Sequence, residues 1–428
     1  MKSELRIQKI QEIANIESNK SGSKNITYKD DTLEMQAYKI PVEYLVFNQY
    51  NGRIGTFVKT YEKQYQTIDA TTDEGEKLIV DFLWRSKESR NKKTLMDIEE
   101  YGQKEVGIIT KDGVIVDGNR RCMLLKKIAI KNKTNPTYFR AIILPDRLED
   151  SPREIRKLET IYQMGTDQPV DYNAIEKYLK CKELSQEDGF TDEEIAKFMG
   201  EKPAKIKEYL KILDLMEDYL KTYGYKDMYT ILSGEKLEGP FVDLRSYLET
   251  QKTGKRIRGR DWQPDNTDID DLKSIYFDYI RAGFGTQPPR DIGNPAKGKG
   301  IFNHEKIWNE FVSRYEKEVE PINVSEKTLK ELKEERPNET IDNIIKGRNS
   351  DWRSKTESLL KKGLGKSKRE LADVSDANAP MELLQRAKKT LETINTDSSE
   401  FDDNVLDIVK GINGLLWDFQ KIIKNKNK

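Results

Sequence analysis

The chain has 428 residues, of which 36% are hydrophobic and 35% are charged. Its 75 lysines and arginines balance 75 aspartates and glutamates, which excludes a uniformly basic polyanion binder, so that any DNA contact requires a local patch. Two cysteines and one histidine, His304, exclude a zinc cluster, and His304 has no evident partner for nucleophilic catalysis.

The length predicts two to four domains, and the high share of charge favours an elongated or helix-rich architecture over one compact ball. No apolar run approaches the ~18 residues that span a bilayer, and the charged first 25 residues do not have the pattern of a signal peptide. We therefore expect a cytoplasmic protein without a membrane partner.

The N-terminal third alternates between helical and strand patterns. Residues 5–16 have a short helical pattern, and a strand is predicted over 37–47. Residues 55–91 indicate an insertion of mixed helix and loop. A short helix over 95–101 ends at Gly102, a residue type that commonly stops helices.

Two β-rich runs at 106–110 and 114–116 flank an Asp-Gly pair and predict a hairpin. A helix is expected from near Arg121 through residue 129, followed by a strand over 138–144. From residue 152 to 220 the spacing of apolar residues becomes helical, so an all-α region is predicted there.

The remainder of the chain divides into two compositions. Residues 250–300 indicate a basic loop region around one helix over 269–282, which would either contact phosphates or stay solvated. Further on, apolar stripes over 383–394 and 405–423 predict an αα-hairpin that serves as a core or a dimer interface.

The sharpest local signal is the strand–turn–helix sequence Asp-Gly-Asn-Arg-Arg at 117–121. Gly118 allows the backbone to approach an anion, and the following helix directs unpaired N–H groups to the same place. Arg120 and Arg121 add paired guanidinium groups suited to phosphate. The alternative is an ordinary turn whose arginines pair with acidic neighbours.

A second signal is a helix-turn-helix pattern over 190–216. Thr191 and Glu194 form a capping box, Gly200 makes the turn, and Pro203 opens the second helix. The second helix is expected to present a DNA-binding face made of Lys202, Lys205, Lys207, Tyr209 and Lys211. The alternative is an αα-hairpin with solvated lysines.

The arginine turn and the elements before it resemble the Gly-Glu-Arg-Arg box of the ParB family. The segment 46–53 is similar to the first nucleotide-binding segment of that family and places Gln49 and Arg53 in the site. The stretch 159–163 loosely resembles the third box, which supplies an acidic residue and an amide near the metal and the triphosphate; Glu159 and Gln163 stand there. The helix-turn-helix follows in the family's order.

The resemblance spans residues 38–220 and implies a nucleoside triphosphate, CTP or ATP, with magnesium as cofactors, and DNA as a partner. It assigns Glu159 as catalytic and metal-binding, and the nucleotide to Gln49, Arg53, Gly118, Asn119, Arg120, Arg121 and Gln163. Asn119 replaces the usual glutamate and Met164 the usual arginine, which favours binding over hydrolysis. Sulfiredoxin shares this fold, but its mechanism needs a cysteine where Asn119 stands.

The predicted fold class is α+β: a small ParB/sulfiredoxin-like mixed domain, an all-α helix-turn-helix domain and a C-terminal helical region. The predicted boundaries are 1–37 extension, 38–150 nucleotide-binding domain, 151–235 helix-turn-helix domain, 236–300 basic linker and 301–428 C-terminal helices that form a homodimer. Two alternatives to a nucleotide-regulated DNA-binding protein stay open: an enzyme on the same fold (NTPase, nuclease or small-molecule kinase), and an adaptor without a ligand.

Overall fold

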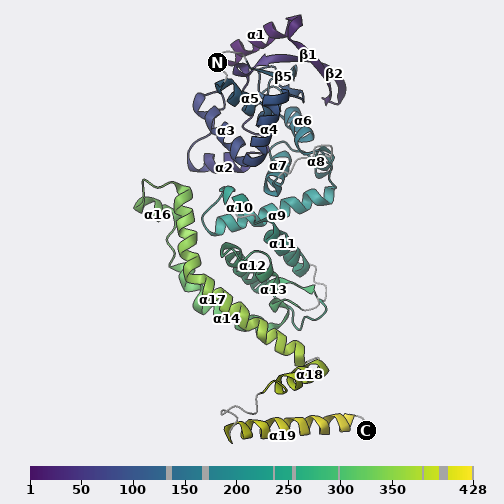
Figure 1. Ribbon diagram of the computed structural model, residues 1–428, viewed down its shortest axis with the longest axis vertical. Coiled ribbons are helices and arrows are strands. Elements are labelled where there is room, and N and C mark those ends of the chain that lie inside the picture. Colours follow the sequence, from purple (N-terminus) through teal and green to yellow (C-terminus); the bar gives the residue numbers. More distant parts are fainter. Residues whose placement is uncertain are drawn as a thin grey trace. The chain divides into compact units, whose positions relative to one another are not determined.

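The computed structural model describes residues 1–131, 137–165, 173–234, 237–252, 257–296, 299–377, 380–394 and 403–426. The chain divides into two compact units, Met1–Leu364 and Gly365–Lys428. Helices dominate both, and one five-stranded sheet lies in the first unit, so the architecture is α+β as the sequence predicted (Figure 1).

The sheet has the strand order β1-β2-β5-β3-β4. Neighbouring strands are antiparallel except β3 and β5, which are parallel. The hairpin predicted around Asp112 and Gly113 is present as β3 and β4. The strands are β1 (Lys20–Tyr28), β2 (Asp31–Pro41), β3 (Gly107–Ile109), β4 (Ile115–Asp117) and β5 (Tyr138–Ile143).

The N-terminal residues 1–37, predicted as an extension, take part in this sheet. They supply α1 (Ser3–Ala14), the whole of β1 and the first half of β2. The strand predicted over 37–47 begins earlier and ends at Pro41, where the chain enters the 3₁₀ turn Val42–Tyr44. Polar outward positions in β1 concealed the alternation from the sequence pattern, because only its last residues are buried.

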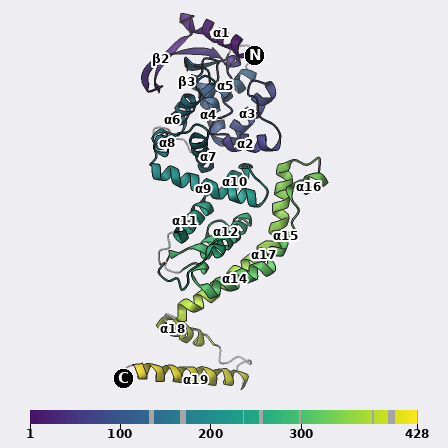
Figure 2. The same ribbon diagram turned by 180° about the vertical axis from the view of Figure 1, so that it is seen from behind.

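Both faces of the sheet are covered, and consecutive strand residues enter different cores. Ile109 and Ile115 pack in a core with residues of the four helices that follow β2 along the chain, whereas Ile108 and Val116 pack in a second core with residues of α6. Figures 1 and 2 show these helices around the strands. The helices are α2 (Gly55–Gln64), α3 (Asp73–Ser86), α4 (Glu88–Tyr101), α5 (Asn119–Lys131) and α6 (Pro152–Met164).

The rest of the first unit is helical and has an aromatic core in which Tyr219 meets Phe241 and Phe277 edge to face. The stretch predicted as a basic linker contains helices before and after the expected one. The helices are α7 (Ala174–Gln186), α8 (Asp192–Met199), α9 (Pro203–Thr222), α10 (Thr230–Gly234), α11 (Glu238–Lys252), α12 (Asn266–Arg281), α13 (Gln287–Gly293), α14 (Glu305–Glu318), α15 (Glu320–Val324), α16 (Leu329–Glu335) and α17 (Ile341–Ala377).

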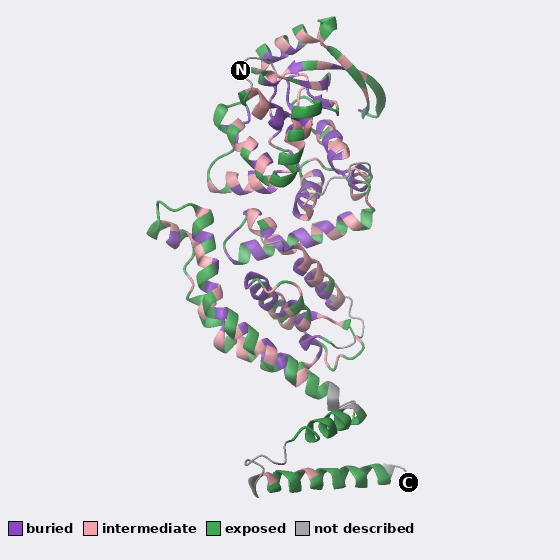
Figure 3. Cartoon of the chain, in the orientation of Figure 1, coloured by how far each residue is buried: buried purple, intermediate pink, exposed green. Residues whose placement is uncertain are grey.

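The second unit contains the end of α17, from Gly365 to Ala377, followed by α18 (Pro380–Leu391) and α19 (Asp403–Lys426). Their apolar stripes are exposed, for example at Leu383 (41%) and Leu415 (58%), so the burial expected of an αα-hairpin is not seen (Figure 3). In the described ranges, no helix is both long enough and apolar enough to cross a membrane. The other predicted domain boundaries stay predictions.

Candidate functional site

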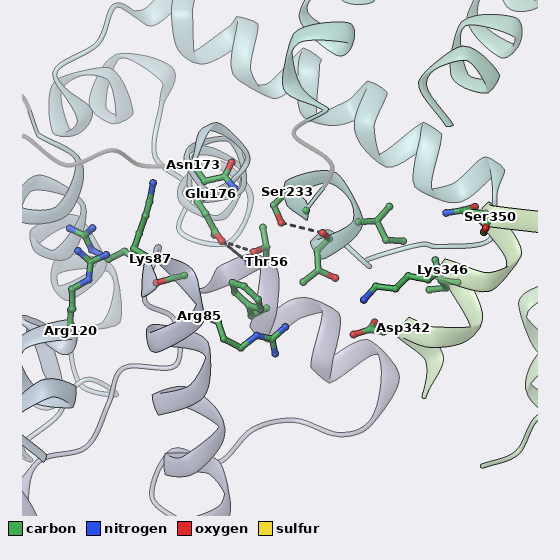
Figure 4. Close-up of a pocket in the computed structure, with 18 of the residues that line it drawn as sticks. Thr56, Arg85, Lys87, Arg120, Asn173, Glu176, Ser233, Asp342, Lys346 and Ser350 are labelled. Carbon is green, nitrogen blue, oxygen red and sulfur yellow. Dashed lines mark hydrogen bonds between the residues drawn. The ribbon is translucent and has the colours of Figure 1, made fainter. Parts of the chain in front are cut away.

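A cavity of about 800 Å³ lies in the first unit, within the size range of small-molecule sites (Figure 4). Its walls come from the segment before α2, from α2 itself, from the α3–α4 junction, and from α5, α7, α10 and α17. The side chains that carry its chemistry are Arg53, Thr56, Arg85, Lys87, Arg120, Asn173, Glu176, Ser233, Asp342, Lys346, Asn349, Ser350 and Arg353.

The cavity is cationic. Six arginines and lysines line it against two carboxylates, those of Glu176 and Asp342. The side chains of Lys87 and Lys346 have no hydrogen-bond or ion-pair partner within the described part of the chain. A concave wall with uncompensated positive charge attracts anions, because the field lines of its charges converge in the cleft.

The arginine turn contributes one guanidinium group to this cavity. Arg120 lines it, whereas Arg121 turns to Asp117, whose carboxylate lies 2.9 Å from the guanidinium. Adjacent residues on a helix are about 100° apart, so the two side chains leave α5 in different directions. The sequence predicted a pair of arginines around one phosphate; the structure brings Arg120 to the cavity and gives Arg121 the acidic neighbour of the alternative interpretation.

Gly118 adopts φ +105°, as its place in the turn requires. A Cβ atom at this position would lie 2.6 Å from Cζ of Phe139 and 3.2 Å from the guanidinium of Arg121. The glycine is therefore required by the packing of β5 against the turn, and it does not line the cavity.

Asn119 is buried at the first position of α5. Its amide oxygen accepts a hydrogen bond from the backbone N–H of Asn48 (3.0 Å), and its amide nitrogen donates to the carbonyl of Ile115 (3.0 Å). These bonds connect the arginine turn to the segment 46–53, so that Arg53 and Arg120 line the same cavity. The side chain is thus engaged in positioning the two segments.

Gln49 lies apart from this cavity. It lines a smaller one of about 190 Å³ together with Lys180, and Glu176 borders both cavities. The segment 46–53 therefore presents Arg53 and Gln49 to different spaces.

Glu159 and Gln163 are buried on α6, in a polar cluster that the sequence did not indicate. The carboxylate of Glu159 accepts hydrogen bonds from Gln163 (3.0 Å) and from the ammonium of Lys180 (3.2 Å), and all three side chains are buried. Burial raises the pKa of Glu159, and the Lys180 charge opposes that shift. No cluster of three His, Cys, Asp or Glu side chains suited to a metal occurs among the described residues. In this geometry Glu159 is an ion-pair partner rather than an available metal ligand.

Glu176 is a buried carboxylate that lines the cavity. The Thr56 hydroxyl donates to it at 2.6 Å and the Thr56 N–H at 3.2 Å, at the start of α2. Burial raises its pKa to about 7, and hydrogen bonds from Thr56 limit the shift. This carboxylate therefore changes charge near neutral pH at the wall of an anion-attracting cavity.

The helix-turn-helix elements are present as α8 and α9. Thr191 and Glu194 form the predicted capping box, Gly200 is left-handed at φ +66°, and Pro203 is the first residue of α9. Tyr209 is not on the outer face as predicted. It is 7% exposed, packs against Tyr178 at 4.8 Å between ring centroids and donates to Glu201, so it belongs to the packing of α7 against α9.

The lysines of α9 differ in their surroundings. Lys205 pairs with Glu208 at 3.1 Å, and Lys211 pairs with Glu249 at 3.2 Å. Lys207 is exposed with Asp192 at 4.0 Å, and Lys202 is exposed at the helix start. Exposed ion pairs are weak, so phosphates can replace these carboxylates.

Within the predicted basic linker, Arg260 is held inside the fold. Its guanidinium donates to Gln251 and to Asn303 and lies 5.4 Å from the ring centroid of Phe302. Burial lowers its pKa, with Asp261 opposing the shift. Residues 253–256 of the same stretch lie outside the described residues. Arg260 thus anchors this loop and is not a solvated phosphate contact.

Sequence reasoning missed four cationic residues of the cavity. Arg85 and Lys87 come from the segment that was predicted to be an insertion, and Lys346 and Arg353 come from α17, beyond the recognised resemblance. They form no motif, and only the fold brings them to Arg120. A local signal existed for Arg85 and Lys87 alone, which are separated by one residue in the chain.

No family model matches the sequence, and no curated protein matches it. The solved structures that match include two of the C-terminally truncated chromosome-partitioning protein ParB from Caulobacter crescentus. The one complexed to the centromeric parS site has a TM-score of 0.27 and 17% identity over 51% of this chain and 93% of that one. The one complexed with CTP-gamma-S has a TM-score of 0.16 and 18% identity over 49% and 92%. At such scores these likenesses do not define the site, and its function follows from this chain's own residues.

Proposed function

We propose that this protein is a ParB-like, nucleotide-binding protein that contacts DNA, and that the cationic cavity holds a nucleoside triphosphate, CTP or ATP. The observation that carries the proposal is that Arg53 and Arg120 line the same cavity. They come from two segments that separately resemble nucleotide-binding boxes, and they line one cavity together with Lys87 and Lys346, whose side chains pair with no described residue. Arginine and lysine side chains around a pocket are the usual means of holding phosphate groups.

Magnesium, which the resemblance implies, has no site built from the described side chains. Glu159 is engaged by Lys180 and Gln163, so it does not fit the role of a metal ligand. Mg²⁺ commonly keeps its waters and binds through substrate phosphates. We therefore assign any magnesium to the nucleotide and not to this chain.

A hydrolytic function is the second candidate, and it is favoured by the raised pKa of Glu176 at the cavity wall. A carboxylate with a pKa of about 7 at the cavity wall has the property of a general base. Its test is nucleotide turnover: Glu176→Gln should abolish the hydrolysis of ATP or CTP while binding persists. Failure of the wild-type protein to release phosphate from either nucleotide would exclude this candidate.

The nucleotide proposal is tested by thermal unfolding with CTP, ATP or GTP, each with and without magnesium. A ligand at ~100 times its dissociation constant stabilises a protein by ~2.7 kcal/mol. Arg120→Ala should abolish the shift, whereas Arg121→Ala, which removes the neighbouring guanidinium from Asp117, should retain it. Absence of a shift with every nucleotide would instead support an adaptor without a ligand.

For the DNA partner we propose α8 and α9, with Lys202 and Lys207 as the phosphate contacts. Both are exposed near the start of α9, where N–H groups of the first turn face outward. Because nearby carboxylates neutralise Lys205 and Lys211, this surface should bind DNA weakly and with a strong dependence on salt.

We also propose that two copies of the chain associate through α19. Its apolar residues repeat every seven positions, a pattern typical of coiled coils. The seam consists of Val405, Ile408, Ile412, Leu415, Phe419 and Ile422. A second copy carries the same seam, so a symmetric pair would cover both.

The mass of the full-length chain in sedimentation equilibrium tests this association. Leu415→Glu should shift a dimer to a monomer, whereas Gln420→Glu adds the same charge outside the seam and should not. A monomeric wild-type chain at micromolar concentration would refute the association.

A further inference from the structure

The cavity has a second cationic end on α17, outside the part of the chain that resembles a known family. In Figure 4, Arg120 and Lys87 lie at one end of the drawn cavity and Lys346 at the other. Thr56, Arg85, Glu176 and Ser233 lie between the two ends in this view. The site therefore offers cations to more than one part of an extended ligand.

A buried polar network fixes the position of α17. The side-chain oxygen of Asn349 accepts hydrogen bonds from Tyr225 (3.0 Å) and from Arg281 (2.9 Å), and the Trp352 indole donates to Asn323 (2.7 Å). Arg281 also lies 4.5 Å from the ring centroid of Trp352. The helix therefore has a defined register, and Lys346, one turn before Asn349, has a defined place at the cavity wall.

The Lys346 side chain makes no stabilising polar contact within the described fold. It is exposed, and no described carboxylate or acceptor lies within bonding distance of its ammonium group. Asp342, one turn earlier on the same face, instead accepts a hydrogen bond from Gln64 (3.1 Å), which connects α17 to the end of α2. An unpaired ammonium at the open wall of a cationic cavity suits a phosphate, because lysine acts on phosphates as a compact point charge.

We propose that Lys346 binds the outermost phosphate of the triphosphate that Arg53 and Arg120 hold, so that the site distinguishes triphosphates from monophosphates. This inference rests on the proposed nucleotide site. On this proposal, a monophosphate held at the Arg120 end leaves Lys346 without a contact, and only a ligand that extends from the Arg120 end to α17 gains one. Binding then connects the N-terminal sheet module to α17 only when the full phosphate chain is present.

The test is calorimetric titration of the full chain with CTP and CMP, and with ATP and AMP, in magnesium. Lys346→Ala should weaken triphosphate binding about tenfold, the loss expected for one charge-assisted contact, and leave monophosphate binding within about twofold. Lys346→Arg should restore most of the difference. Lys355→Ala is the matched control, because Lys355 is exposed on the opposite side of the same helix, nine residues further along.

Two outcomes would overturn the inference. In the first, Arg120→Ala abolishes triphosphate binding, but Lys346→Ala changes the triphosphate and monophosphate affinities equally or not at all. The nucleotide site would then be supported, but Lys346 would not distinguish triphosphates from monophosphates. If the wild-type chain binds none of the four nucleotides, the proposed site and this inference fail together. Melting temperatures of the variants exclude unfolding as the cause, since Lys346 is exposed.

Discussion

The cationic cavity and the outer surface of α9 use the same residue types in opposite ways. In the cavity, Lys87 and Lys346 have no carboxylate partner among the residues that the structure describes. On α9, Lys205 and Lys211 pair with Glu208 and Glu249 at 3.1 and 3.2 Å. A chain with zero formal net charge thus has places where positive charge is neutralised and a place where it is not.

This difference affects the expected binding at each place. Uncompensated cations in a concave site bind an anion without first losing another partner, whereas paired surface lysines must exchange a carboxylate for a phosphate. Nucleotide binding should therefore be the stronger and more specific property, and DNA binding the weaker one.

The largest expected effect comes from the most deeply paired lysine, Lys180. It is buried with Glu159 at 3.2 Å, and removal of one partner of a buried ion pair typically destabilises a protein by about 3–5 kcal/mol. Lys180→Met should therefore lower the midpoint of urea unfolding strongly. The double variant Glu159→Gln, Lys180→Met should regain most of the stability. An unchanged midpoint for Lys180→Met would mean that Glu159 is not bound to this lysine and is available as a ligand.

The next effect is the pH dependence of stability caused by Glu176. Its folded pKa, about 7, lies above the usual carboxyl value because of burial, so the folded state binds an extra proton between about pH 4.5 and 7. Stability should therefore fall as pH rises through this window, by about 3 kcal/mol in total, and stay low above it.

Glu176→Gln should remove that slope, because the amide does not titrate and its oxygen can still accept from Thr56. Melting temperatures at pH 5.5 and 8 measure both proteins. The wild-type temperature should fall between the two values by more than that of the variant, for which the other titrating groups are the control. Parallel changes in the two proteins would contradict a protonated, buried Glu176.

A smaller loss is expected for Asn119→Ala. The variant removes two buried hydrogen bonds, to Asn48 and Ile115, and leaves their backbone groups unsatisfied, which should cost about 1–3 kcal/mol. Because the side chain connects the two segments and does not line the cavity, the nucleotide-induced thermal shift should persist at saturating ligand. Loss of that shift in a folded variant would show that Asn119 takes part in nucleotide binding.

Sequence reasoning predicted the local elements better than the directions of their side chains. The glycine turn before α5, the capping box of α8 and the αL residue Gly200 were predictable because they depend on a few neighbouring residues. The orientation of the Arg121 side chain was not predictable, because Asp117, four residues earlier, forms an ion pair with it. Tyr209 was likewise misplaced, because α7 covers the side of α9 that the sequence pattern left open.

The cavity shows a second limit of sequence reasoning. Arg53 and Arg120 were predictable from motif-like segments, but Lys346 is more than 200 positions away in the chain from Arg120. Nothing in the sequence around Lys346 differs from an ordinary solvated helix face. The network of Asn349, Arg281 and Trp352 fixes the register of α17, and the hydrogen bond from Gln64 to Asp342 connects this helix to the N-terminal module. Such long-range contacts leave no local pattern.

The smallest expected effect concerns the lysines on the outer surface of α9. Lys202→Ala with Lys207→Ala removes two exposed cations, which should weaken binding to a random-sequence duplex several-fold. It should also reduce the slope of log affinity against log salt by about two. The matched variant Lys205→Ala with Lys211→Ala removes the same charge, but from lysines whose carboxylate partners, Glu208 and Glu249, lie closer (3.1 and 3.2 Å) than Asp192 lies to Lys207 (4.0 Å). Its slope should therefore change less. Equal slopes for the two variants would show that these ion pairs open freely, and unchanged affinity in both would remove α9 from the DNA contact.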